Sequence, residues 1–265
     1  MISTTAHFVR DRESVEASYA VLPAQLSAGK RLGRDQQWGA IEALVFRAAR
    51  GETAWLKPAL FSILLAFPLL SQLPPRVALP KPETLGGKHL MQALRERRSE
   101  RAFAPRDLTP QVVSNLLWAA DGVNRPDGRR SAPSAMNRQT IDIYVVKADG
   151  AYLYNPTQNQ LDPVAAADLR GATGTQSYVA QAPLNLVYVS DYSKMGDSPE
   201  IDKAMLAGAE TGFVGQNVYL YCASVGLATV IRASIDKDAL TKALKLRPGQ
   251  HVVLAQTVGY PKAAH

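Results

Sequence analysis

The chain has 265 residues, of which 46% are hydrophobic. This is enough apolar sequence to form a core, and it excludes a wholly disordered protein. The net charge is +7, but residues 89–265 hold nineteen basic and sixteen acidic side chains, an excess of only three. Because no dense basic stripe with interleaved aromatic residues is present, we expect no nucleic-acid binding. A single cysteine and four scattered histidines predict neither an intrachain disulfide nor a metal site.

The N-terminal third shows no catalytic motif. Residues 1–55 have weak periodicity, with one helix expected over 37–50. The next segment has a single lysine, then the apolar run 59–70, then a polar, proline-rich stretch. This order is typical of a secretory signal peptide, whereas a membrane span needs about 20 apolar residues. We therefore expect 56–74 to be a signal peptide or an uncleaved membrane anchor of an exported, periplasmic protein whose true start lies near Leu56. Residues 1–55 would then be an extension of doubtful origin. The alternative is an ordinary helix within a genuine extension of a cytoplasmic protein.

Residues 75–88 read as an extended linker, because prolines and a Gly-Gly pair discourage both helix and central strand. The catalytic domain is expected over 89–265. It opens with a short helix that runs into RRSERAF, residues 97–103, where three arginines and a serine lie within five residues. Arginine presents paired, permanently charged donors that suit a phosphate. The alternative is a solvated helix end, paired with Glu96 and Glu100.

The rest of the domain alternates helices and strands. Thr109 is expected to cap a helix over 110–120, with proline at its first position. The loop over 121–140 is long enough to favour a functional role, and its centre, Ala-Pro-Ser-Ala-Met-Asn (132–137), suits a planar polar ligand. Strands are expected over 141–147, 151–154, 184–190, 227–231 and 251–260, and helices over 164–169, 176–181, 199–225 and 236–244.

These patterns predict an α+β domain rather than a doubly wound sheet. No GxGxxG follows a strand and no GxxxxGK[ST] occurs, so RRSERAF remains the candidate phosphate site. The 199–225 helix carries small residues at three- and four-residue spacing, which makes that face a candidate subunit interface. Cys222, within the same helix, is expected to be a buried core residue.

Five motifs in order resemble the FMN-dependent nitroreductase family, over about residues 87–262. They are RRSERAF, the Ala-Pro-Ser-Ala-Met-Asn loop, the small-residue helix, the Val225-Gly226-Leu227 turn leading to Ile231-Arg232, and Val258-Gly259-Tyr260-Pro261. Leu-Leu-Trp-Ala-Ala (116–120) is further similar to the SagB-type, thiazole-oxidase-like branch. The resemblance implies a nitroreductase-like fold with a mixed or antiparallel central sheet flanked by helices. It also implies an intertwined homodimer with FMN at the interface.

The resemblance also implies site residues. Around the FMN phosphate and ribityl chain these are Arg97, Arg98, Ser99 and Arg101, with Lys262 completing the phosphate site. The loop that the partner subunit lays over the flavin corresponds to Pro133, Ser134, Ala135 and Asn137. Ala233 and Ser234 correspond to the segment whose backbone amides face the reactive edge of the ring, with Arg232 beside them.

The implied function is an FMN-dependent oxidoreductase that works by ping-pong hydride transfer from a nicotinamide donor, NAD(P)H, to a small organic acceptor such as a nitroaromatic or a quinone. Flavin carries the chemistry, which agrees with the lack of a Ser-His-Asp set or a carboxylate pair. Two alternatives remain: an oxidase or dehydrogenase of peptide heterocycles, and a flavin-binding module without turnover. Export from the cytosol would favour a donor other than NAD(P)H.

Overall fold

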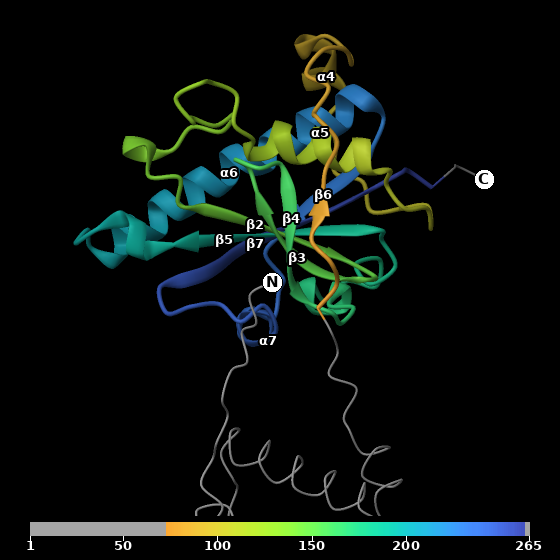
Figure 1. Ribbon diagram of the computed structural model, residues 1–265. Helices are drawn as coiled ribbons and strands as arrows, with labels where there is room; N and C mark the ends of the chain where they lie inside the picture. The colour runs from red at the N-terminus through yellow and green to blue at the C-terminus, as the bar shows by residue number, and fades with distance from the viewer. Residues whose placement is uncertain (1–72, 263–265) are drawn as a thin grey trace, which may run out of the picture. The chain divides into compact units, whose positions relative to one another are not determined.

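The computed structural model describes residues 73–262 (Figure 1). The helix expected over 37–50, the apolar run 59–70 and nearly all of the candidate signal peptide lie outside these residues. Among the residues that are described, none of the helices combines the length and the apolar character that a membrane span needs.

A seven-stranded sheet forms the centre of the domain, in the order β1-β4-β3-β2-β5-β7-β6, and every neighbouring pair is antiparallel. This confirms the antiparallel form of the expected α+β fold. The five predicted strands, β2, β3, β5, β6 and β7, match their predicted positions within one residue at each end. The strands are β1 (Val77–Ala78), β2 (Ile141–Lys147), β3 (Gly150–Asn155), β4 (Gln160–Ala165), β5 (Leu184–Asp191), β6 (Ala228–Arg232) and β7 (Gln250–Gly259).

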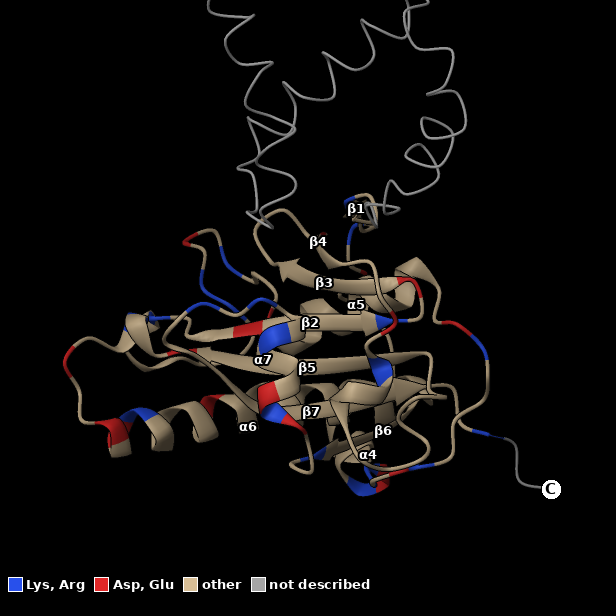
Figure 2. Ribbon diagram, turned by 90° about the horizontal axis from the view of Figure 1, so that it is seen from below, with Lys and Arg blue, Asp and Glu red and all other residues tan. Residues whose placement is uncertain are grey.

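The strands supply two cores because their side chains alternate between the two faces of the sheet. In β2, Ile143 and Val145 join the core beneath α5 (Pro110–Asp121) and α6 (Glu200–Val225), together with Leu117 and Val218. Tyr144 and Val146 join the opposite core with residues of α7 (Lys237–Ala243). Figure 1 shows this layering, with α4 (Leu90–Glu96), α5 and α6 on one side and α7 on the other. In Figure 2, α7 crosses in front of the central strands.

The helices begin and end where their capping residues predict. The Thr109 hydroxyl accepts a hydrogen bond from Val112 N (3.3 Å) at the start of α5, and the Asp236 carboxylate accepts one from Ala239 N (2.9 Å) at the start of α7. Gly226 ends α6 with φ = 77°, a left-handed conformation that glycine adopts without steric cost. Cys222 is fully buried, as expected.

The predicted linker is ordered against the domain. Glu83 N donates to Asn115 Oδ1 (2.9 Å), and Lys88 N donates to Ser224 Oγ (2.9 Å). Gly87 has φ = 77°, and a Cβ there would lie only 2.1 Å from Ser224 Oγ. The Gly-Gly pair therefore allows the segment to cross closely over the end of α6.

Two predicted helices are wrong. The segment 164–169 instead includes the end of a strand, because Gln160–Ala165 forms β4, which pairs with β3 across the short turn 156–159. The β-pairing overrides the weak helical periodicity of this segment. A short 3-10 helix, η2 (Arg170–Thr173), follows it. The segment 176–181 forms only turns, with Val179 N donating to Gln176 O (3.1 Å). β1 is a third correction, since it lies within the predicted linker.

Candidate functional site

The RRSERAF run leaves α4 and follows the edge of the sheet. Glu100 N donates to Thr229 O of β6 (2.9 Å), and Ala104 N donates to Tyr260 O (2.9 Å). Lys262 N donates to Ala102 O (3.1 Å), so the backbone of Lys262 lies beside the residue that follows Arg101. The structure thus brings together the arginine cluster and the C-terminal lysine, two motifs more than 150 residues apart in the sequence.

A tyrosine of α6 fixes the centre of this run. The Tyr219 hydroxyl lies 2.8 Å from Ser99 Oγ and accepts a hydrogen bond from Ile231 N (3.0 Å). Either hydroxyl can be the donor in the contact between Tyr219 and Ser99, because a hydroxyl both donates and accepts. The Arg97 guanidinium lies over the Tyr219 ring, 5.2 Å from its centroid. Tyr219 is 8% exposed and links the arginine run to β6.

The cations of the run divide into paired and available groups. Arg98 pairs with Glu100, as the alternative of a salt-bridged helix end predicts. Glu96 pairs with Lys88 (2.6 Å), which lies outside the run, rather than with Arg97 or Arg101. Within residues 73–262, Arg97 and Arg101 form no ion pair, although Arg97 retains its contact with Tyr219. A cleft of about 590 Å³ is lined by Arg97, Arg98, Tyr219 and Thr229 among others. An unpaired guanidinium in this cleft, that of Arg97, is suited to a phosphate.

The Ala-Pro-Ser-Ala-Met-Asn loop is anchored by a buried carboxylate of α6. Glu210 is 3% exposed, and its Oε1 accepts hydrogen bonds from Ala135 N (2.8 Å) and Ser134 Oγ (3.1 Å). Its Oε2 accepts one from Thr140 Oγ1 (2.6 Å). One side chain thus holds the middle of the loop, through Ser134 and Ala135, and also Thr140, three residues beyond the loop.

The loop presents strained backbone to the surface. Met136 and Asn137 have φ values of 53° and 55°, a region that non-glycine residues rarely adopt. Asn137 and Pro133 are exposed, whereas Ser134 and Ala135 are half-buried against Glu210. The Glu210 anchor lies nine residues before Tyr219 on α6, which is about 13 Å along a helix. Within one chain, the loop and RRSERAF therefore attach to different parts of α6.

A buried ion pair lies behind this loop. Arg130 Nη1 contacts Asp121 Oδ2 at 2.7 Å, and both side chains are largely buried. Burial raises the pKa of Asp121 to about 7, with Arg130 opposing the shift and the carboxylates of Glu210 and Asp142 adding to it.

The end of β6 carries the other predicted flavin-facing segment. Ala233 and Ser234 are exposed, and Ser234 O accepts a hydrogen bond from Thr175 N (3.3 Å). The Arg232 side chain turns inward instead and is 8% exposed. Its guanidinium donates to Thr257 Oγ1 (2.6 Å), to Asn185 Oδ1 (3.0 Å) and to both oxygens of Thr173 (3.0 Å each). Arg232 therefore does not share the surface of the other predicted cofactor residues.

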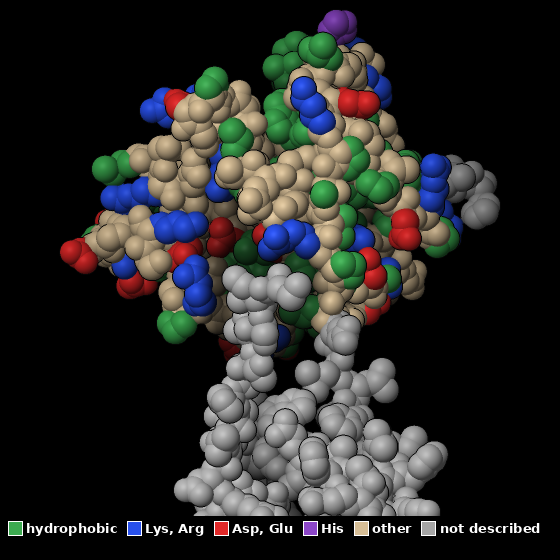
Figure 3. All heavy atoms as spheres, viewed as in Figure 1, with side chains coloured by type: hydrophobic (Ala, Val, Ile, Leu, Met, Phe, Trp, Pro, Cys, Tyr) green, Lys and Arg blue, Asp and Glu red, His purple; other side chains and the backbone are tan. Residues whose placement is uncertain are grey.

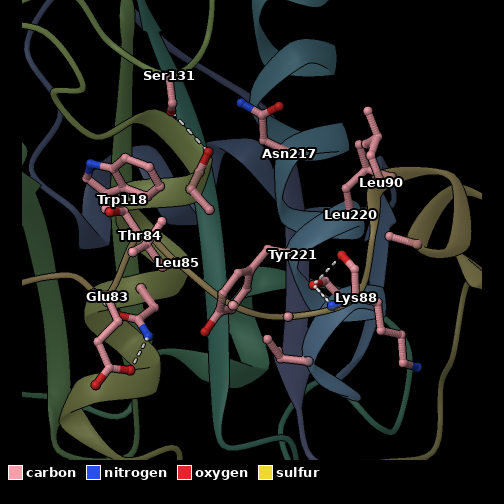
Figure 4. Close-up of a pocket in the computed structure, with 17 residues that line it drawn as sticks. Glu83, Thr84, Leu85, Lys88, Leu90, Trp118, Ser131, Asn217, Leu220 and Tyr221 are labelled. Atoms are coloured by element: carbon pink, nitrogen blue, oxygen red, sulfur yellow. Dashed lines mark hydrogen bonds between the residues drawn. The ribbon is translucent and has the colours of Figure 1, made fainter.

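A second cleft, of about 490 Å³, lies on the opposite side of the C-terminal half of α6 (Figure 4). Trp118 of α5 and Tyr221 of α6 line it together with Leu90 of α4, and Asn217 and Ser131 lie at its edge. Its lining mixes apolar and aromatic side chains with amides and hydroxyls, and it carries one acidic and one basic residue, Glu83 and Lys88.

Sequence reasoning missed Glu210 and Tyr219. Both lie on the buried stripe of α6, among Ala207, Val214 and Val218. A carboxylate on an otherwise apolar stripe is the signal that could have identified Glu210, because a buried charge requires partners. Tyr219 gave no such signal, since tyrosine is common in cores.

Residues 94–260 match the Nitroreductase family. The chain belongs to the nitroreductase family. A Methanocaldococcus jannaschii protein that carries the name nitroreductase is 30% identical over 180 residues, which are 64% of this chain and 90% of that protein. A solved structure from Ralstonia eutropha JMP134, also named as a nitroreductase, is 37% identical with a TM-score of 0.69. The match covers 74% of this chain and 92% of that one.

The NADPH:FMN oxidoreductase of Vibrio harveyi, solved with NAD+, is 19% identical with a TM-score of 0.50. The match covers 66% of this chain and 69% of that one. At this identity the likeness concerns the fold alone. Family membership confirms the expected enzyme class, an FMN-dependent oxidoreductase. The SagB-type branch stays a prediction, because these matches do not separate the branches of the family.

Proposed function

We propose that this nitroreductase-family chain forms a homodimer that binds FMN at RRSERAF and passes hydride from NAD(P)H to a small nitroaromatic or quinone-like acceptor in a ping-pong cycle. The observation that carries the proposal is Arg97, which has no carboxylate partner in the described domain, lines the cleft beside RRSERAF and lies over Tyr219, the residue whose hydroxyl contacts Ser99. An anion that receives these donors gains charge-assisted hydrogen bonds.

The residues present fit FMN. The cleft beside RRSERAF has a volume of about 590 Å³, within the range of small-molecule sites, and the backbone of Lys262 lies next to the run. Arg97, Arg101 and Lys262 would hold the phosphate. Bound FMN would supply hydride acceptance and transfer.

The chain's own residues orient and enclose the cofactor. Tyr219, which lines the cleft, holds Ser99 through the contact between their hydroxyls. The exposed Ala233–Ser234 segment would place backbone N–H groups toward the reactive ring edge, where they stabilise negative charge. Pro133 to Asn137, anchored by Glu210, would cover the flavin of the partner subunit.

Two surfaces support the homodimer. The outer side of α6 exposes Ile201 (77%), Met205 (64%) and Phe213 (45%), and a Cβ added at Gly208 or Gly212 would contact nothing in the chain. The surface of α4 exposes Leu90, Met91 and Leu94, and Figure 3 shows hydrophobic side chains gathered in this region of the molecule. Leu90 also lines the cleft of Figure 4, so the exposed apolar surface continues into that cleft.

The test is reconstitution. The purified chain is incubated with FMN, freed of unbound flavin and mixed anaerobically with NADH or NADPH in a stopped-flow instrument. We expect bleaching of the flavin absorbance by the donor and its return when a nitroaromatic or a quinone is added. A protein that retains no FMN, or whose flavin transfers no electrons to either acceptor, contradicts the proposal.

A further inference from the structure

The guanidinium of Arg232 is a buried cation without a carboxylate partner. Each of its hydrogen bonds goes to a neutral acceptor of Thr173, Asn185 or Thr257, and its Nε has no partner at all. Gly174 closes over this nitrogen, since a Cβ there would lie 2.4 Å from Nε. A buried cation normally pairs with an anion, because burial without one is costly.

The groups that act electrostatically on Arg232 do not supply that anion. They are the phenols of Tyr178 and Tyr188, and neither side chain carries a carboxylate. Burial lowers the pKa of Arg232 to about 10, so the side chain still carries its charge at neutral pH. The positive charge therefore remains uncompensated in the protein alone.

The charge lies close in the chain to the segment that is predicted to face the flavin. Arg232 is the last residue of β6 and directly precedes Ala233–Ser234. The loop that binds the guanidinium through Thr173 also donates from Thr175 N to Ser234 O, so the charge and the exposed segment belong to one connected unit. In the proposed function, this segment faces the reactive edge of FMN.

We propose that Arg232 is a positioning residue for charge: its buried guanidinium, directly before the Ala233–Ser234 segment and joined to it through the Thr173–Thr175 loop, stabilises the negative charge that FMN gains on reduction, and thereby raises the midpoint potential of the bound cofactor. This inference rests on the proposed function. Oxidised FMN that takes up two electrons and one proton carries one additional negative charge. A buried cation nearby favours that form over the oxidised one, because the charge acts through a medium of low dielectric constant.

The experiment measures the midpoint potential of the FMN-loaded full chain against reference dyes at pH 7. For Arg232→Gln we expect reduced FMN to lose at least about tenfold in affinity relative to oxidised FMN, a fall of about 30 mV for a two-electron couple. Arg232→Lys keeps the charge and should stay within about 10 mV of the wild type. Arg170→Gln is the matched control, because Arg170 pairs with Asp168 at 2.7 Å and its charge is already compensated.

A second variant covers the case in which Arg232→Gln does not fold. Asn185→Asp is nearly isosteric and places a carboxylate where Asn185 Oδ1 accepts from Arg232, so it should also lower the potential. Unchanged potentials in Arg232→Gln and Asn185→Asp, or equal shifts in Arg232→Gln and Arg232→Lys, overturn the inference while FMN binding stands. A wild-type chain that retains no FMN overturns the proposed function instead.

Discussion

Glu210→Gln is the substitution that tests most sharply how the Ala-Pro-Ser-Ala-Met-Asn loop is held. The glutamine keeps one oxygen for Ser134 Oγ and Ala135 N, but it replaces the oxygen that accepts from Thr140 Oγ1 with an NH2 group. The Thr140 hydroxyl can rotate to accept instead. The variant therefore loses the negative charge that strengthens these hydrogen bonds. A hydrogen bond to an ionised acceptor contributes about 1.5–3 kcal/mol to stability.

We therefore expect the free energy of unfolding to fall by about 2–4 kcal/mol, measured by urea denaturation of the full chain. Glu200→Gln is the control: Glu200 is 75% exposed and pairs with Lys203 at 3.0 Å, so its loss should cost less than about 1 kcal/mol. If the two variants are equally stable, the carboxylate of Glu210 does not anchor the loop.

Three further predictions follow from named contacts. Between pH 4 and 7 the folded chain retains a proton on Asp121, whose pKa is about 7, while an unfolded aspartate has released it. The free energy of unfolding should therefore fall as pH rises through this range, and denaturation of Asp121→Asn at several pH values should show a smaller fall. Tyr219→Phe removes the hydroxyl shared by Ser99 and Ile231, and fluorescence titration should show FMN binding weakened by about 1–2 kcal/mol, with Tyr192→Phe unchanged. Phe213→Asp places a charge on the exposed face of α6 and should shift sedimentation from dimer to monomer; a dimer that persists would place the interface elsewhere.

Much of the fold could be predicted from local sequence. The predicted bounds of β2 and α6 agree closely with the structure because both sequence patterns are strong. β2 shows alternation with β-branched residues, and α6 is a long run of small and apolar residues that ends at Gly226. β4 could not be found in this way. It contains Pro163, which is unusual within a strand. It pairs with β3 in a hairpin and with β1, more than 80 residues earlier in the chain, and its own residues lack the alternation that marks β2.

The candidate site was predicted as motifs rather than as contacts. The sequence predicts both RRSERAF and Lys262 as phosphate-binding residues. It does not predict the hydrogen bond between the backbones of Lys262 and Ala102, because that contact depends on how the two segments align at the edge of the sheet. The resemblance to the family predicts Arg232 as a cofactor-binding residue because of its place beside Ala233 and Ser234. Its neighbours in the sequence do not indicate that its side chain turns inward. Its partners, Thr173, Asn185 and Thr257, come from three separate segments.

The central claim is that RRSERAF holds the phosphate of FMN. Equilibrium titration of the chain with FMN tests it most directly, for the wild type, Arg97→Ala and Arg101→Ala. The control is Arg125→Ala, which removes an exposed arginine outside RRSERAF. Each of the two RRSERAF variants should weaken binding by about 1.5–3 kcal/mol, since each removes a charge-assisted donor to the anion, whereas Arg125→Ala should bind as the wild type does. Unchanged FMN affinity in both RRSERAF variants would show that the phosphate is bound elsewhere.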